Sequence, residues 1–224
     1  MNTDQFLTHY WPFENGTMLD VIGSAHMTQG QNTIFTNDRF LNANSALALN
    51  GGWTQVPSGV YFNTPEFTIS LWVYPQNVGF CSRVLDFSNS QSIFADNVYF
   101  KLDNRCTGNV SLNNQFEANI FSGSVSKVSC LSSSLLANNQ WQYIVVTYDQ
   151  SVMSLYLNGI LTGTCINTWK LLTLTRAYNY IGRAFTLNSN VQVSYSYLDD
   201  LRFYNKSLTQ MEIVELYQNQ TMGL

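Results

Sequence analysis

Apolar and polar residues alternate with a period of two along much of the chain. In residues 67–74, positions 67, 69, 71 and 73 are apolar, and Pro75 ends the run. Residues 141–148 are rich in β-branched and aromatic side chains and carry no helix signal. A period of two places alternate side chains on opposite faces of a strand. Both segments are therefore predicted to be strands.

A β-hairpin is predicted at Asn158-Gly159. Residues 152–157 alternate before this pair, and a second run follows at 160–164. Asn-Gly between alternating runs favours a type I′ turn, because both residues tolerate positive φ. Short strands at regular spacing, without helices between them, are typical of a sandwich or a barrel. Further strands are expected at 45–49, 97–102, 178–185 and 197–204.

One short helix is predicted near the end of the sequence. Thr209 and Glu212 have the spacing of a capping box, in which each side chain caps an exposed backbone amide. Apolar residues then recur at helical spacing, at 211, 213, 214 and 217. No linker, low-complexity break or block of charge divides the chain, so residues 1–224 are interpreted as a single domain.

Composition excludes several classes of function. Only 11% of the residues are charged, whereas Asn, Gln, Ser and Thr together number 80 of 224. The pI of about 5.0 and the absence of basic clusters exclude a basic nucleic-acid binder. The longest apolar run is four residues, as at 143–146, which is far short of the roughly 20 that a membrane helix needs. No membrane insertion by this segment is expected.

The four cysteines bear on the cellular compartment. No C-x-x-C pair is present and no histidine lies near a cysteine in the sequence, so a zinc site is not expected. Two disulfides in an oxidising compartment are predicted instead; buried free thiols in a cytosolic protein are the alternative. Three pairings are possible, and the sequence does not choose among them. The cysteines expected to form these two disulfides are Cys81, Cys106, Cys130 and Cys165.

The start of the sequence and its glycosylation sequons both bear on the predicted extracellular location. Residues 1–9 lack the basic end and apolar stretch of a signal peptide. We therefore expect either that a leader has been removed or that the sequence is one domain of a longer extracellular protein. The sequons predict a glycoprotein modified at one or more of Asn15, Asn109, Asn205 and Asn219.

Seven sequence blocks follow one another between about residues 10 and 218. They are YWPFENG at 10–16 with LD at 19–20, ALALNG at 46–51, FTISLWVYP at 67–75, WQYIVVTYD at 141–149, LYLNG at 155–159, YIG at 180–182 and LDDLRFYN at 198–205. In this order they resemble LamG-like (laminin G type 3) domains of the concanavalin A-like lectin/glucanase superfamily. The resemblance implies an all-β jelly-roll sandwich of two antiparallel sheets, usually an extracellular recognition or adhesion module.

Catalytic residues are not expected. Retaining glycosidases need two carboxylates about 5 Å apart, which on one strand means acids two or four residues apart, as in related glucanases. None of the five Glu has such a partner. The two histidines, His9 and His26, lie near the N-terminus, and no G-x-S-x-G elbow is present. A polysaccharide-degrading enzyme is therefore the alternative rather than the first hypothesis.

A structural calcium ion is predicted. Period two places Asp199 on the side of Leu201 and Phe203, facing the core, and a carboxylate there is costly unless it is paired. No Arg or Lys is expected on that face, and Ca²⁺ accepts oxygen ligands of several kinds. The resemblance implies further ligands from loops near the N-terminus, for which Asp20 and Asn50 are the candidates. The alternative is that Asp199 lies in water or accepts backbone N–H bonds.

Two tryptophans are the candidate ligand-binding residues. Trp53 and Trp169 occupy irregular positions, where an exposed ring could stack on a sugar; covering a sheet edge is the alternative. Trp11, Trp72 and Trp141 lie in the family blocks and are expected in the core. We expect a non-catalytic extracellular module that binds a glycan or a protein. Self-association through exposed edge strands is a further possibility.

Overall fold

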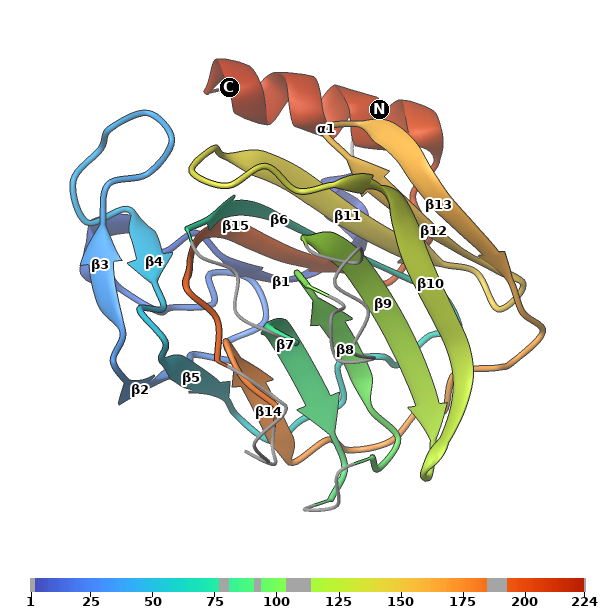
Figure 1. Ribbon diagram of the computed structural model, residues 1–224. Helices are drawn as coiled ribbons and strands as arrows, with labels where there is room; N and C mark the ends of the chain where they lie inside the picture. Colours follow the sequence, from blue (N-terminus) through green and yellow to red (C-terminus); the bar gives the residue numbers. More distant parts are fainter. Residues whose placement is uncertain (1–2, 77–80, 91–93, 104–113, 185–192, 224) are drawn as a thin grey trace.

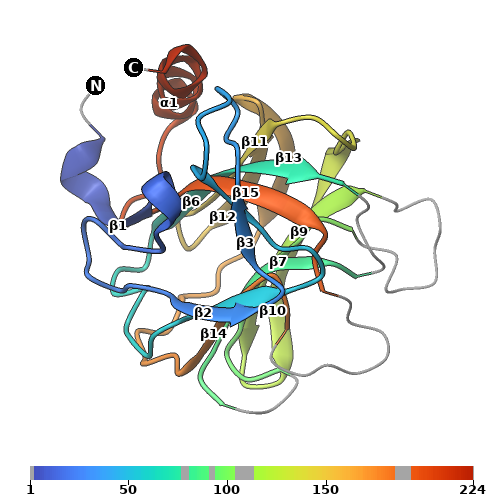
Figure 2. The same ribbon diagram turned by 90° about the vertical axis from the view of Figure 1, so that its left-hand side faces the viewer.

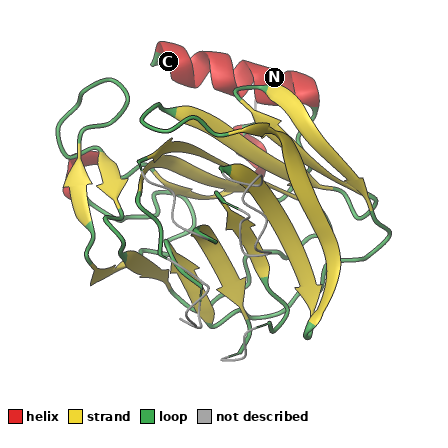
Figure 3. Cartoon of the chain, viewed as in Figure 1, coloured by secondary structure: helices red, strands yellow, loops and turns green. Residues whose placement is uncertain are grey.

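Two antiparallel sheets stack face to face, and one helix lies outside the first of them (Figures 1 and 3). The computed structural model describes residues 3–76, 81–90, 94–103, 114–184 and 193–223. The first sheet has eight strands, in the order β13-β12-β11-β6-β15-β4-β3, with β1 paired to β15. The second has seven, in the order β10-β9-β8-β7-β14-β5-β2. The predicted jelly-roll sandwich is confirmed.

The strands of the eight-stranded sheet are β1 (Leu7–Trp11), β3 (Ile34–Thr36), β4 (Ala46–Ala48), β6 (Phe67–Pro75), β11 (Gln142–Tyr148), β12 (Val152–Leu157), β13 (Ile160–Ile166) and β15 (Ser196–Tyr204). Those of the seven-stranded sheet are β2 (Thr28–Gln31), β5 (Trp53–Val56), β7 (Arg83–Ser88), β8 (Val98–Lys101), β9 (Gln115–Ser122), β10 (Val125–Leu135) and β14 (Tyr178–Ile181). The helices are α1 (Gln210–Met222) and the short 3-10 turns η1 (Asp4–Phe6) and η2 (Glu14–Gly16).

The local sequence signals correspond to the observed elements. Leu157 pairs with Ile160 across the predicted hairpin, and Asn158 and Gly159 both have positive φ. Thr209 caps α1, and the reciprocal bond of the capping box to Glu212 is present. None of the helices in the described ranges is long and apolar enough to span a membrane.

The core lies between the two sheets, and a smaller apolar layer lies under α1. Trp11 belongs to the central core. Trp72 lies on the other face of β6, where its ring contacts those of Tyr143 and of Tyr217 in α1. Figure 2 shows α1 lying over this sheet. Trp141 is half-buried at the margin of this layer. The helix therefore covers the outer face of the eight-stranded sheet, and no described helix covers the outer face of the other.

A β-bulge in β15 reverses the predicted orientation of Asp199. Asp199 pairs with Trp72, yet the next register pair joins Arg202 to Ser70, so β15 has one extra residue. Asp200 has a φ of 53° at this bulge. Leu201 and Phe203 remain in the central core, whereas Asp199 faces the α1 side with Trp72. The prediction that Asp199 shares a face with Leu201 is therefore wrong.

A disulfide links the two sheets at one edge. Cys130 of β10 is bonded to Cys165 of β13, with 5.5 Å between their Cα atoms. Cys81 is also disulfide-bonded. Cys106 and the sequon residue Asn109 lie outside the described residues. The prediction of disulfide-bonded rather than free cysteines is confirmed for the three cysteines in the described ranges.

Candidate functional site

A continuous row of polar and aromatic side chains crosses the outer face of the seven-stranded sheet. Each residue of the row is the direct cross-strand partner of the next. At about 4.8 Å per strand, the row is roughly 29 Å long. From edge to edge it consists of Ser129, Asn119, Tyr99, Asp86, Tyr180, Gln55 and Thr28.

The alternating sequence of each strand creates this row. Phe87, Val98 and Ile120 are each adjacent in the sequence to a row residue and belong to the core. Their neighbours Asp86, Tyr99 and Asn119 therefore point to the opposite side. The middle of the row is buried, whereas Ser129 and Thr28 at its two ends are exposed.

Two buried ion pairs lie at the middle of the row, one involving the row residue Asp86 and the other beside the row. Arg83 binds the Asp86 carboxylate, and its guanidinium lies 3.8 Å from the centre of the Tyr99 ring. The second oxygen of Asp86 accepts a hydrogen bond of 2.6 Å from the Asn97 amide. These contacts hold the Asp86 carboxylate in a fixed orientation.

Beside the row, Lys101 Nζ lies 2.6 Å from Glu117 Oε2. The Glu117 Oε1 atom accepts hydrogen bonds from the Asn119 amide and, at 3.0 Å, from the Ser129 hydroxyl. Burial lowers the pKa of Lys101, although the adjacent Glu117 charge opposes the shift. Burial likewise raises the pKa of Tyr99, so its hydroxyl stays protonated.

The β5–β14 end of the row is an aromatic cluster in which the Tyr180 ring is buried and the Trp53 ring is partly exposed. The rings of Trp53 and Tyr180 meet edge to face, with centroids 5.3 Å apart. The Arg183 guanidinium lies 4.8 Å from the Trp53 ring and 4.9 Å from the Tyr180 ring. Trp53, Gln55 and Arg183 are all half-buried. An aromatic surface next to amide and guanidinium groups can bind the apolar face and the hydroxyls of a polyhydroxylated ligand.

The two predicted ligand-binding tryptophans lie apart. Trp53 belongs to the aromatic cluster, but Trp169 packs against the central core near β10. The Lys127 ammonium lies 4.5 Å from the Trp169 ring, and the Tyr148 hydroxyl donates to the Trp169 carbonyl. Four strands separate β10 from β5 in the sheet, so these two rings do not form one site.

Asp20, one of the predicted calcium ligands, already has a full set of protein donors. Its carboxylate accepts hydrogen bonds from His9 Nδ1 at 2.7 Å and from the backbone amides of Tyr10, Ile22, Gly23 and Ala25. Burial alone would raise the pKa of Asp20, but these hydrogen bonds outweigh burial and lower it. No lone pair is left for a cation.

The other two predicted ligands do not complete a calcium site either. Asp199 binds the Arg39 guanidinium, and Asn50 is exposed in a turn with positive φ. Burial and the neighbouring Asp200 charge raise the pKa of Asp199 to about 8, against the attraction of Arg39. Within the described ranges no three His, Cys, Asp or Glu residues are grouped as a metal site. The three residues do not fit Ca²⁺ in this arrangement, and calcium binding stays a prediction.

Sequence reasoning did not find the carboxylates of the sheet face. Asp86 and Glu117 lie on β7 and β9, two strands apart, and a search along single strands cannot detect such a pair. The sequence feature that could have indicated this pair is the alternation of polar with core residues in the three neighbouring strands β7, β8 and β9. Asp86 and Glu117 are separated by two strand spacings and by two residues along the strands, so their Cα atoms lie roughly 12 Å apart, whereas the carboxylates of a retaining glycosidase lie roughly 5 Å apart.

Sequence comparison identifies one family. The laminin G type 3 model, described as the concanavalin A-like lectin/glucanases superfamily, matches residues 49–214. Comparison with curated proteins gives no significant match.

Solved structures of similar fold include sugar-binding domains. Domain 4 of AbnA, an extracellular arabinanase from Geobacillus stearothermophilus solved with arabinotriose, has a TM-score of 0.70 at 19% identity, over 95% of this chain and 98% of that one. The ligand-binding domain of botulinum neurotoxin serotype D, solved with N-acetylneuraminic acid, has a TM-score of 0.69 at 15% identity, over 97% of this chain and 52% of that one. The chain thus spans about half of the toxin domain, and at these identities the likeness concerns the fold.

Proposed function

The chain belongs to the concanavalin A-like lectin/glucanase superfamily, and we propose that it is a module that binds a glycan on the outer face of its seven-stranded sheet without cleaving it. The observation that carries this proposal is the cluster of partly exposed Trp53 and Arg183 against the buried Tyr180 ring at the end of the polar row. Aromatic rings with a few fixed polar groups are typical of small-molecule and sugar sites.

The arabinanase domain supports the choice of a glycan. It was solved with arabinotriose, and this chain covers 98% of it. The toxin domain was solved with N-acetylneuraminic acid, but the chain matches only 52% of its length, so that likeness weighs less.

The state of the carboxylates supports binding without catalysis. Asp86 and Glu117 are each ion-paired with a cation of the same sheet face. A retaining glycosidase needs two carboxyl groups about 5 Å apart that act directly on the glycosidic bond, whereas each of these two side chains is engaged by a cation of the protein. The alternative of a polysaccharide-degrading enzyme predicts release of reducing sugar from a bound oligosaccharide.

An extracellular location is part of the proposal. The Cys130–Cys165 disulfide supports it, because disulfides persist mainly in oxidising compartments. The similar arabinanase is itself an extracellular protein.

Self-association is a second candidate that one observation favours. The edge strand β13 exposes three large apolar side chains, Ile160 at 68%, Leu161 at 48% and Ile166 at 85%. Exposed apolar edge strands are templates for pairing between chains. Light scattering over a range of protein concentrations tests it: a monomeric mass throughout excludes this candidate.

A glycan array that includes arabino-oligosaccharides and sialylated glycans tests glycan binding. We expect Trp53→Ala to weaken binding to the best-bound glycan by about tenfold or more, because buried aromatic anchors carry much of a site's affinity. Trp141→Ala removes a half-buried tryptophan outside the sheet face and is the matched control. Trp169→Ala tests separately whether the second predicted tryptophan contributes to glycan affinity.

Three outcomes would contradict this function. A lack of binding to any glycan would favour a protein ligand. Hydrolysis of the bound glycan would favour the enzyme. An equal loss of affinity in Trp53→Ala and Trp141→Ala would place the site elsewhere.

A further inference from the structure

Aromatic side chains continue from Trp53 along the strands of the seven-stranded sheet. In β14, Asn179 is buried and pairs with Val56 of β5, which belongs to the core. Tyr178 and Tyr180 flank Asn179 and therefore point to the opposite, outer face of the sheet. Tyr178 is half-buried, as Trp53 is, whereas Tyr180 is buried.

The two partly exposed rings lie at opposite ends of β5. Gln55 is two residues after Trp53 and pairs with Tyr180, and Tyr178 is two residues before Tyr180 in β14. Because the strands are antiparallel, Trp53 and Tyr178 lie on opposite sides of this pair, roughly 14 Å apart along the strands. These four residues form an aromatic strip along β5 and β14, which lie side by side in Figure 1.

The aromatic strip is open on one flank. On the other flank the row residues of β7 and β8 are buried, with exposures of 1% for Asp86 and 5% for Tyr99. On the open flank, the edge strand β2 has the exposed residue Gln31 opposite Trp53. A chain-like ligand can therefore extend along the strip but not across β7 and β8.

The strip suits a neutral ligand with many hydroxyl groups. Neither β5 nor β14 contains a charged residue. The amides of Gln55 and Gln31 can each donate hydrogen bonds to hydroxyl groups and accept them from hydroxyl groups. A ring at each end with an amide between them can therefore stack on two separate sugar units and bind the hydroxyls of the units between.

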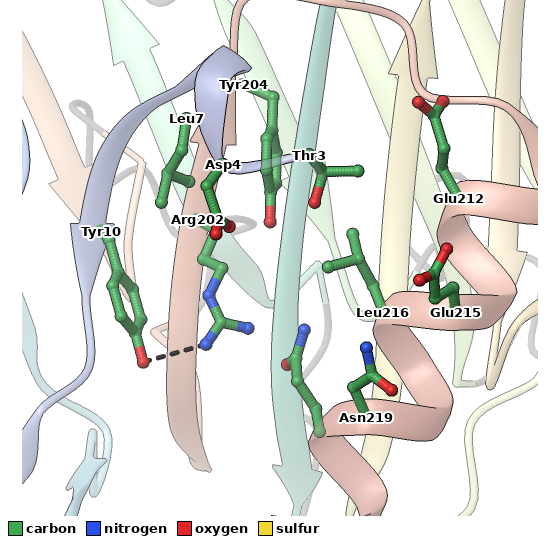
Figure 4. Close-up of a pocket in the computed structure, with 11 residues that line it drawn as sticks. Thr3, Asp4, Leu7, Tyr10, Arg202, Tyr204, Glu212, Glu215, Leu216 and Asn219 are labelled. Carbon is green, nitrogen blue, oxygen red and sulfur yellow. Dashed lines mark hydrogen bonds between the residues drawn. The ribbon is translucent and has the colours of Figure 1, made fainter. Parts of the chain in front are cut away.

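A cavity between β1, β15 and α1, on the outer face of the other sheet, is the competing place for a sugar (Figure 4). Its volume is about 290 Å³. Arg202 donates to the Tyr10 hydroxyl at 2.9 Å, and its guanidinium lies 4.3 Å from the centre of the Tyr10 ring and covers one face of it. Tyr204, the other ring among the described lining residues, is buried. The strip therefore offers a sugar more aromatic surface than this cavity.

We propose that the aromatic strip binds a linear oligosaccharide of about three or four units lengthwise, with one unit stacked on Trp53 and another on Tyr178. Gln55 bonds hydroxyl groups of the units between the two rings. The proposal rests on the glycan-binding function above and adds to it a second stacking residue and the length of the ligand.

Titration calorimetry with arabino-, xylo-, cello- and manno-oligosaccharides of one to six units tests the length. In each series that binds, we expect the affinity to rise about tenfold or more from the monosaccharide to the tetrasaccharide, because the second ring adds a stacking contact. Between four and six units it should change less than about twofold, because the longer chain extends past both rings. This series uses the unaltered chain, so it decides the length even if a variant does not fold.

Two substitutions at Tyr178 test the second contact. We expect Tyr178→Ala to weaken binding of the tetrasaccharide about tenfold and to leave the affinity for the disaccharide, which binds at Trp53, unchanged. Tyr178→Phe keeps the ring and should bind the tetrasaccharide as wild type does. Tyr74→Ala removes a half-buried tyrosine of the eight-stranded sheet and is the matched control, and Asn219→Ala probes the cavity of Figure 4. Neither of these two should alter the affinity.

The proposal is overturned if a monosaccharide binds as tightly as its tetrasaccharide, or if none of the four series binds. It is also overturned if Tyr178→Ala binds the tetrasaccharide as tightly as Tyr74→Ala, if Tyr178→Ala weakens the disaccharide and the tetrasaccharide equally, or if Asn219→Ala weakens binding. A blank glycan array, by contrast, contradicts the proposed function itself.

Discussion

Asp20 shows how one buried carboxylate can organise a loop. Four backbone amides and the His9 ring donate to it, so residues 20–25 are held against β1. Gly23 lies so close to His9 that a Cβ atom there would be 2.2 Å from Nδ1. In this arrangement the Asp20 carboxylate anchors the loop to β1.

This anchor predicts a specific dependence of stability on pH. The pKa of Asp20 in the folded chain lies below its unfolded value, so its contribution is present above about pH 4 and is lost as the pH falls through the folded pKa. We expect Asp20→Asn to lower the free energy of unfolding by about 2–3 kcal/mol at pH 7 and by much less near pH 2. Urea unfolding at both pH values checks this; an equal loss at both would show that the charge of Asp20 is not what stabilises the loop.

Metal removal gives a second prediction at the level of residues. Because protein donors already occupy Asp20 and Asp199, we expect rigorous treatment with EDTA to leave the unfolding midpoint unchanged within about 1 °C. A midpoint that falls with EDTA and recovers with added Ca²⁺ would show that these side chains rearrange around an ion, or that the ion lies at other residues.

At the level of elements, the sequence predicts features that depend on adjacent residues but not features that depend on the pairing of distant strands. The Asn158-Gly159 hairpin and the Thr209 cap depend on adjacent residues, so the sequence contains all that determines them. The bulge at Asp200 depends on how β15 pairs with β6 and has no sequence signature. Period two therefore placed Asp199 on the wrong face and hid its partner Arg39.

The proposed glycan site likewise depends on strand pairing that the sequence does not predict. Trp53 could be proposed from its position, but its partner Tyr180 comes from a strand far away in the chain. The row on the seven-stranded sheet exists only because six pairings are in register, and no single strand contains that information.

The disulfide between β10 and β13 supplies a test at this scale. The bonded cysteines are 35 residues apart. A disulfide that closes a loop of that length lowers the entropy of the unfolded chain and thereby stabilises the folded state by about 3–4 kcal/mol. We expect the double variant Cys130→Ser, Cys165→Ser to lose roughly this much stability in urea unfolding. A non-reducing peptide map should show the pair directly, and a peptide joining Cys130 to any other cysteine would contradict the structure.

At the level of the whole molecule, the two sheets have different outer faces. Helix α1 covers one with Trp72 and Tyr143 beneath it, whereas the other presents the polar row and the Trp53 cluster. The low content of charge suits this arrangement, because Asp86 of the row is paired with Arg83, and Glu117 beside the row is paired with Lys101. Amides and aromatic rings are left as the groups available to the proposed glycan.

The most direct test is to observe the five tryptophan indole N–H signals by NMR while titrating the glycan that binds best on the array. We predict that the Trp53 signal shifts progressively with glycan and saturates, while the buried Trp11 and Trp72 signals remain in place. A titration in which Trp53 stays unchanged while Trp141 or Trp169 shifts would contradict the assignment of the glycan site to the outer face of the seven-stranded sheet.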